Sequence, residues 1–159
     1  MLRSLSVRNL VLIDSLDLEF GPGLSVLTGE TGAGKSILLD ALGLALGARG
    51  DAQLIRRGAE SASVSASFEL VADHPAWAML DQQGFEPADE LILRRVLGGD
   101  GRSRAFANGQ PANITWLREL GSLLVEIEGQ SAAGGLLDVK NHRDLLDSFA
   151  DNGKERAQT

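Results

Sequence analysis

Cysteine is absent from the 159-residue sequence. Its absence excludes a disulfide framework and a thiolate metal site, and it fits a reducing compartment. Hydrophobic residues make up 43% of the chain and charged residues 23%, which is an ordinary globular composition. The length suits one domain that is large enough to bury a core.

Long apolar runs are missing as well. The first eight residues, MLRSLSVR, lack the continuous apolar stretch of a signal peptide. No segment reaches the roughly 20 consecutive apolar residues that a transmembrane helix requires. We therefore expect a cytoplasmic protein without a membrane partner.

Positive charge is in deficit, because the formal net charge is −7. An acidic surface offers little general attraction to nucleic acid or to anionic lipid. We therefore expect this chain by itself to bind DNA weakly. Arg102 and Arg104 flank a hairpin signal, where charges that protect an edge strand explain them better than DNA contact does.

Glycine, in contrast, is abundant, and one cluster of glycines matches G-x-x-x-x-G-K-[ST] in full. Glycines let successive backbone N–H groups point at phosphate oxygens, and the helix that follows adds its own N-terminal N–H groups. Lys35 can reach the β- and γ-phosphates, and the Ser36 hydroxyl can ligate Mg²⁺. The predicted binding residues are Gly29, Glu30, Thr31, Gly32, Ala33, Gly34, Lys35, Ser36 and Ile37.

Two apolar segments flank this motif. Leu24–Thr28 predicts a short strand, and the stretch from Lys35 to Leu46 predicts a helix that is apolar and buried on nearly all sides. The alternative is a glycine-rich turn that contains Lys-Ser by chance, but such a turn needs neither flank. The sequence therefore predicts a P-loop that binds ATP together with Mg²⁺.

Alternation of apolar and polar residues predicts further strands, and capping residues predict short helices. Asp73 is the expected N-cap of one helix, and Asn113 or Thr115 that of another. Asn108-Gly109 signals a hairpin. The expected strands cover 5–10, 16–20, 64–70, 90–96, 103–107 and 123–127, and the expected helices 73–83, 113–120 and 141–149.

An alternating strand pair before the P-loop, with a β-rich segment after its helix, resembles the ABC-type ATPase heads of SMC-like proteins. No Asn-Lys-x-Asp motif is present, which counts against a GTPase. Within the SMC-like group the sequence resembles the RecN family of bacterial recombination and repair ATPases, from residue 1 to about 149. The segments that carry this resemblance are 7–14 (VRNLVLID), 20–24 (FGPGL), 28–37 (TGETGAGKSI), 40–43 (DALG), 97–109 and 117–121 (LRELG).

The resemblance implies an α/β fold: the N-terminal lobe of a P-loop ABC-type head, with a mixed sheet and an antiparallel β-rich subdomain. It places that lobe at residues 1–150 and the start of a coiled-coil arm at 151–159. The implied function is ATP binding in DNA double-strand-break repair and recombination. The implied partners are a C-terminal lobe, a second identical head joined through ATP, and DNA in the full-length protein.

The resemblance also implies individual roles. Gln130 matches the Q-loop glutamine that contacts Mg²⁺ and the attacking water, so Gln130 and Lys35 are the expected catalytic residues, with Ser36 and Gln130 on the metal. Arg56 matches a basic position near nucleotide and DNA. A solvated turn explains Arg56 equally well, and an exposed loop residue is the plain alternative for Gln130. The residues around Gln130 depart from the family's histidine-rich pattern.

The chain lacks other parts that hydrolysis needs in this class. No signature motif is present, and Glu126 follows an apolar run without the second acidic residue of a carboxylate motif. His74 and His142 are expected to be caps or surface residues rather than switches. We therefore expect ATP binding without significant turnover. The rivals are a self-contained P-loop kinase or phosphotransferase, for which no lid of arginines is visible, and a structural module gated by ATP.

Overall fold

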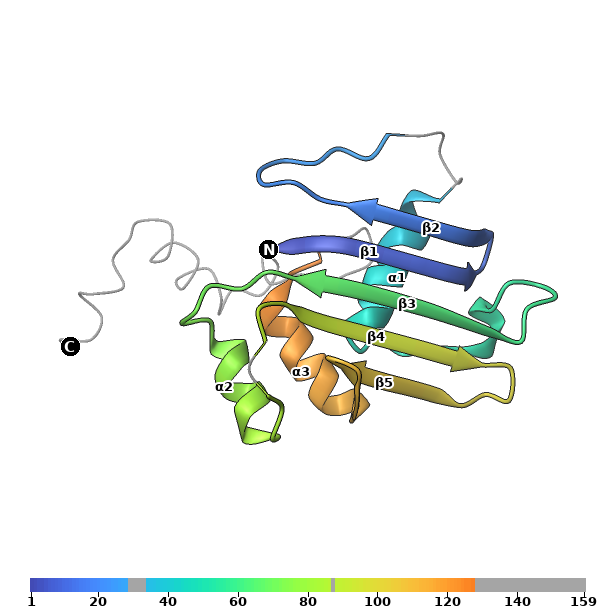
Figure 1. The fold of residues 1–159 in the computed structure, drawn as a ribbon. Coiled ribbons are helices and arrows are strands. Elements are labelled where there is room, and N and C mark those ends of the chain that lie inside the picture. The colour runs from blue at the N-terminus through green and yellow to red at the C-terminus, as the bar shows by residue number, and fades with distance from the viewer. Residues whose placement is uncertain (29–33, 87, 128–159) are drawn as a thin grey trace, which may run out of the picture. The chain divides into compact units, whose positions relative to one another are not determined.

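The computed structural model describes residues 1–28, 34–86 and 88–127. The chain divides into two compact units, Met1–Val125 and Glu126–Thr159, and only Glu126 and Ile127 of the second unit are described. Figure 1 shows the elements of the first unit. In chain order they are β1 (Leu2–Leu10), β2 (Ile13–Glu19), α1 (Lys35–Ala45), the 3₁₀ helix η1 (Ala52–Leu54), β3 (Ser61–Phe68), α2 (Pro75–Gln82), β4 (Leu91–Gly98), β5 (Ser103–Ala107), β6 (Gln110–Ala112) and α3 (Ile114–Leu124).

Six strands form one sheet in the order β2-β1-β3-β4-β5-β6, and every neighbouring pair is antiparallel. The chain leaves the sheet after β2, forms α1, and returns to the other side of β1 as β3 (Figure 1). Val7 in β1 shows the register, since it pairs with Leu16 of β2 and with Val64 of β3. The expected α/β class with an antiparallel β-rich part is confirmed.

One face of this sheet is apolar because side chains alternate between the two faces along each strand. Val7, Val64 and Leu93 lie on this face and are fully buried. α1 and α3 pack against it, and they contribute the buried Leu44 and Leu117 (Figure 1). Each such side chain stabilises the fold by about 1.5–3 kcal/mol relative to an exposed position.

α1 and α3 approach each other closely at two glycines. A Cβ atom on Gly47 would lie 2.6 Å from the backbone nitrogen of Arg118, and one on Gly121 would lie 2.6 Å from the carbonyl oxygen of Leu46. The Arg118 guanidinium also donates a hydrogen bond through Nε to the Gly47 carbonyl, at 3.2 Å. Backbone contact at this crossing therefore requires glycine on both helices.

Capping side chains begin the other two helices. The Nδ1 atom of His74 accepts a hydrogen bond from the Ala76 N–H at 3.1 Å, so His74 caps α2 and the expected cap Asp73 is wrong by one residue. The Oδ1 atom of Asn113 accepts from the Thr115 N–H at 2.8 Å. This bond confirms Asn113 as one of the two caps expected for α3.

The expected strand at Leu24–Thr28 is wrong. These residues have no regular secondary structure, and the Leu24 and Val26 side chains are 93% and 73% exposed. A strand needs a neighbour for its N–H and C=O groups, and none of the described residues supplies one to this segment. The segment is apolar as expected, but the described part of the chain provides no surface that buries its side chains.

The expected strand at 123–127 is also wrong. α3 continues to Leu124, and the extended conformation begins only at Val125. Leu117, Leu120 and Gly121 recur at helical spacing and are buried against the rest of the unit. That packing outweighs the preference of a Leu-Leu-Val sequence for strands.

The remaining expectations fall beyond the described part. The helix expected at 141–149 and the boundary expected after residue 150 lie outside the described residues. Among the helices that the structure does describe, none has the length and apolar character needed to cross a membrane.

Candidate functional site

The N-terminus of α1 carries the last three residues of the glycine-rich motif. Gly34 is the N-cap, with a φ of 132° that L side chains rarely adopt, and the first helical hydrogen bond runs from the Leu38 N–H to its carbonyl oxygen at 3.1 Å. No side chain caps this end, and no acidic residue lies in the first turn. The positive end of the helix dipole at this terminus favours an anion.

The burial of α1 changes along its length, and this corrects the expectation of a helix buried on nearly all sides. Lys35, Ser36 and Leu39 are exposed, whereas Ala41, Leu42, Leu44 and Ala45 are buried. The C-terminal half anchors the helix in the core, and the N-terminal half is more exposed. This arrangement holds Lys35 and Ser36 at the surface on a rigid element, as a phosphate site requires.

Arg56 lies beside the turn that joins β1 to β2. Its N–H donates to the Asn9 carbonyl at 2.9 Å, and the Val11 N–H donates to the Leu54 carbonyl at 2.7 Å. The Arg56 side chain forms an ion pair with Asp14 at 3.0 Å, and both side chains are largely exposed. The structure therefore places Arg56 at the tip of the β1–β2 hairpin, with a carboxylate partner.

That turn is strained. Asn9 and Val11 have φ values of 52° and 51°, and the left-handed region is strongly disfavoured for a β-branched residue such as valine. The two backbone bonds to the 54–56 segment and the buried Leu10 hold the turn in place. Strain of this kind costs about 1–3 kcal/mol and is common at functional sites.

Other predicted site residues lie outside the described residues. These are Gly29–Ala33 of the motif, and Gln130. Ser36 and Lys35 are the predicted metal and catalytic residues that the structure places, together on one exposed helical turn.

Within residues 1–28, 34–86 and 88–127, no three acidic, histidine or cysteine side chains gather as a metal site. A P-loop metal needs no such cluster, because phosphate oxygens and waters supply most of its ligands and the protein adds only a few oxygens.

The sequence interpretation missed a buried charge on the core face. Arg95 is only 2% exposed; its Nε donates to Ser103 Oγ at 2.9 Å, while one of its terminal nitrogens is buried without a partner. Burial lowers the pKa of Arg95, and the charge of nearby Arg118 lowers it further. The signal was readable, because Arg95 shares the alternation of Leu91, Leu93 and Leu97.

A helix that starts at Gly-Lys-Ser and packs on an antiparallel six-stranded sheet gives this chain the fold found in the N-terminal part of SMC and RecF head structures. The chain belongs to the AAA domain family, whose model matches residues 4–116. Solved structures share the fold. One, from work on ATP-driven dimerization and DNA-stimulated activation of SMC ATPases, matches with a TM-score of 0.65 and 20% identity, over 93% of this chain and 98% of that chain.

Two further structures agree on the fold. The SMC head domain from Thermotoga maritima matches with a TM-score of 0.57 and 22% identity, over 74% of this chain and 41% of that chain. The recombination mediator protein RecF bound to ATP matches with a TM-score of 0.54 and 20% identity, over 70% of this chain and 27% of that chain.

Sequence relatives confirm the resemblance to RecN. The DNA repair protein RecN of Xylella fastidiosa (strain 9a5c) is 43% identical over 98% of this chain, and that of Bacillus subtilis is 42% identical over 94%. The chain spans only 28% and 26% of the length of these two relatives.

Proposed function

We propose that this chain is the ATP-binding half of a RecN-like ATPase that acts in DNA double-strand-break repair and recombination. The observation that carries the proposal is the exposed and uncapped N-terminus of α1, where Gly34, Lys35 and Ser36 complete a P-loop motif. The names of the RecN relatives support the repair role. The whole protein would then work in the cytoplasm, in association with the nucleoid.

The described residues fit the phosphates of a nucleotide. Gly34 leaves room for oxygens close to the backbone, since a Cβ there would meet no atom of the described residues within 4 Å. The first-turn N–H groups would bind phosphate oxygens, Lys35 would neutralise the β/γ-phosphate charge, and Ser36 would hold Mg²⁺. The metal would supply charge neutralisation on the phosphates. Gly29–Ala33 and Ile37 would complete the binding loop.

Two further roles belong to the same proposal. Gln130 would orient the attacking water and contact the metal, so its loss should affect turnover more than nucleotide affinity. Arg56 would contact nucleotide, after exchanging its ion pair with Asp14 for a phosphate. That exchange is feasible because an exposed ion pair contributes at most about 1 kcal/mol.

Exposed apolar side chains around the P-loop support the existence of a second half. Leu24, Val26 and Leu27 precede the motif and Leu39 follows it, and all four are exposed. Exposed apolar residues that form a contiguous patch commonly mark an interface, and these four lie close together in the chain. We propose that a C-terminal lobe covers them and pairs with the 24–28 segment. ATP would then join two such heads, with hydrolysis relying on a carboxylate and a signature motif that this chain lacks.

The test is calorimetric ATP binding beside a phosphate-release assay on the same sample, with Mg²⁺ present. We expect the chain to bind ATP, to hydrolyse it little above background, and to lose binding in Lys35→Ala. Lys154→Ala removes the same charge outside the motif and serves as the matched control. Robust turnover that depends on Lys35 would contradict the proposal and favour a self-contained kinase or phosphotransferase. Equal binding by both variants would remove Lys35 from the site.

A further inference from the structure

The second face of the sheet is not covered by the described helices; it carries serines on β3 and arginines among apolar side chains on β4 and β5. α1 and α3 lie behind the sheet in Figure 1, and the strands in front present the side chains that alternate with the core. On β3 these side chains are serines, and Ser63 and Ser65 are half-buried. On β4 and β5 they include Arg94 and Arg104, which are exposed.

Two arginines on this face lack carboxylate partners. By register, Arg94 lies opposite Phe106, and Arg104 lies opposite Val96, so the two arginines are diagonal neighbours on adjacent strands. Diagonal positions are roughly 7–8 Å apart. Neither arginine forms an ion pair within the described part of the chain, whereas Arg3, Arg8, Arg56 and Arg102 each do.

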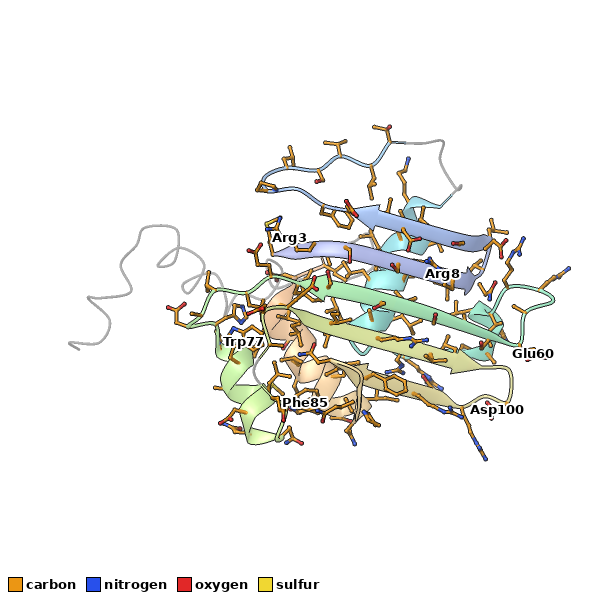
Figure 2. All side chains as sticks on the ribbon, in the orientation of Figure 1. Arg3, Arg8, Glu60, Trp77, Phe85 and Asp100 are labelled. Carbon is orange, nitrogen blue, oxygen red and sulfur yellow. The ribbon has the colours of Figure 1, made fainter. Side chains whose placement is uncertain are left out.

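The charges on this face are separated by strand. Asp17 and Glu19 lie on β2, at one edge of the sheet. Asp17 forms an ion pair with Arg8 of β1, which is labelled in Figure 2. The two unpaired arginines lie on the far side of the serines of β3. Strands β4 and β5 therefore present positive charge on this face, although the net charge of the whole chain is −7.

Protection of a sheet edge explains at most one of these arginines. β6 pairs with β5 only at Ala105, Phe106 and Ala107, so β5 remains the sheet edge at Arg104, whereas β4 is an interior strand between β3 and β5. An arginine in an interior strand gives no protection against edge pairing. The edge-strand explanation expected for Arg104 therefore stands, and it does not apply to Arg94.

We propose that this basic face, defined by Ser63, Ser65, Arg94, Arg104 and Phe106, binds the phosphate backbone of DNA. The proposal rests on the function proposed above and adds the surface that contacts the nucleic acid. Guanidinium groups bind phosphate oxygens with two parallel N–H donors, and serine hydroxyls add further donors. Phe106 lies opposite Arg94 and two residues from Arg104 on the same face, and its ring offers a flat apolar surface to a sugar or base.

Two phosphate contacts give weak binding, in accord with the expectation from net charge. The measurement is a fluorescence titration of labelled duplex DNA from about 50 to 200 mM salt. ATP is present at saturation, so that DNA cannot occupy the P-loop. The surface variant is Arg94→Ser with Arg104→Ser. The control is Arg3→Ser with Arg102→Ser, which removes the same charge from two arginines that are ion-paired with Glu69 and Asp100.

The surface variant should lose roughly tenfold or more in affinity at about 50 mM salt, and its salt slope should fall by about 1.8, which is about 0.9 for each phosphate contact. The control should keep the wild-type slope. Equal loss in both variants, or no DNA binding by the wild type at low salt, would overturn the proposal. Competition by polyglutamate as strong as that by DNA would also overturn it and point to an acidic protein.

ATP binding in the same samples separates the two proposals. If the surface variant binds DNA like the wild type while ATP binding is intact, only the DNA surface is wrong. If the wild type binds no ATP, the function proposed above fails independently of the DNA result. Both arginines are exposed, so an unchanged thermal midpoint is expected for the variant.

Discussion

The two ends of α1 each carry a glycine in the left-handed region, and the reasons for the two glycines differ. A Cβ on Gly34, before the helix, would meet open space, whereas a Cβ on Gly47, after it, would lie 2.6 Å from the Arg118 backbone. The first glycine leaves space for a ligand, and the second allows two helices to touch. Glycines of similar conformation therefore serve binding at one end of this helix and packing at the other.

Gly47→Ala is expected to have the largest effect on stability. The substitution adds left-handed strain of about 1–2 kcal/mol and an overpacking cost of about 1–3 kcal/mol against the backbone of α3. Urea unfolding should show a loss of about 3 kcal/mol. Gly58→Ala is the matched control, because Gly58 has a similar φ of 87° but no atom within 4 Å of the added Cβ. Equal losses at both positions would show that packing at the crossing contributes nothing.

Gly34→Ala should show the reverse pattern. A φ of 132° is unavailable to alanine, so the chain before α1 must rearrange and the N–H groups should lose their alignment on the phosphates. Calorimetry should show ATP affinity reduced by about tenfold or more, a change of at least about 1.4 kcal/mol. The free energy of unfolding should change by less than about 1 kcal/mol, since no described residue packs on the position of the added Cβ. A large loss of stability with normal ATP affinity would contradict the binding role assigned to Gly34.

Arg95→Met tests the contribution of a buried charge to the packed face of the sheet. Methionine keeps a long apolar side chain while it removes a buried charge that has no carboxylate partner in the described residues. Removing buried charge in favour of apolar packing is often neutral or stabilising, and we expect a gain of about 1 kcal/mol in urea unfolding. Arg94→Met, on the exposed face, is the control and should change little. A loss of several kcal/mol would show that Arg95 has a carboxylate partner in the folded protein.

Asp17 gives the smallest effect and serves as a reference far from both helix ends. The hydrogen bond from Ser6 Oγ, followed by that from Arg8, lowers the pKa of Asp17 below its ordinary value of 3.8. A lowered folded pKa contributes stability that is present above the unfolded pKa and is lost as the pH falls through the folded pKa. Ser6→Ala should raise the pKa of Asp17 in an NMR titration. It should also narrow the stability difference between neutral and acid pH. An unchanged pKa would assign the shift to Arg8 alone.

Much of the fold was readable from local patterns. Alternation in 64–70 and 103–107 predicted β3 and β5, Asn108-Gly109 predicted the β5–β6 hairpin, and Asn113 predicted the start of α3. These signals are read correctly because the deciding interactions lie within a few residues of each other. The same local reading predicted a strand at 24–28 and another at 123–127, and both were wrong because burial at those places depends on distant segments.

The sequence by itself determined the Gly-Lys-Ser helix start, the alternation of the strands and the resemblance to RecN. Each of these lies in the identity and spacing of residues near one another in the chain. Only the tertiary structure decided that Gly47 and Gly121 meet, that Arg95 is buried and that Arg94 and Arg104 share an uncovered face. The physical reason is that burial and contact between distant segments follow from how the sheet and helices pack, which local propensity does not specify.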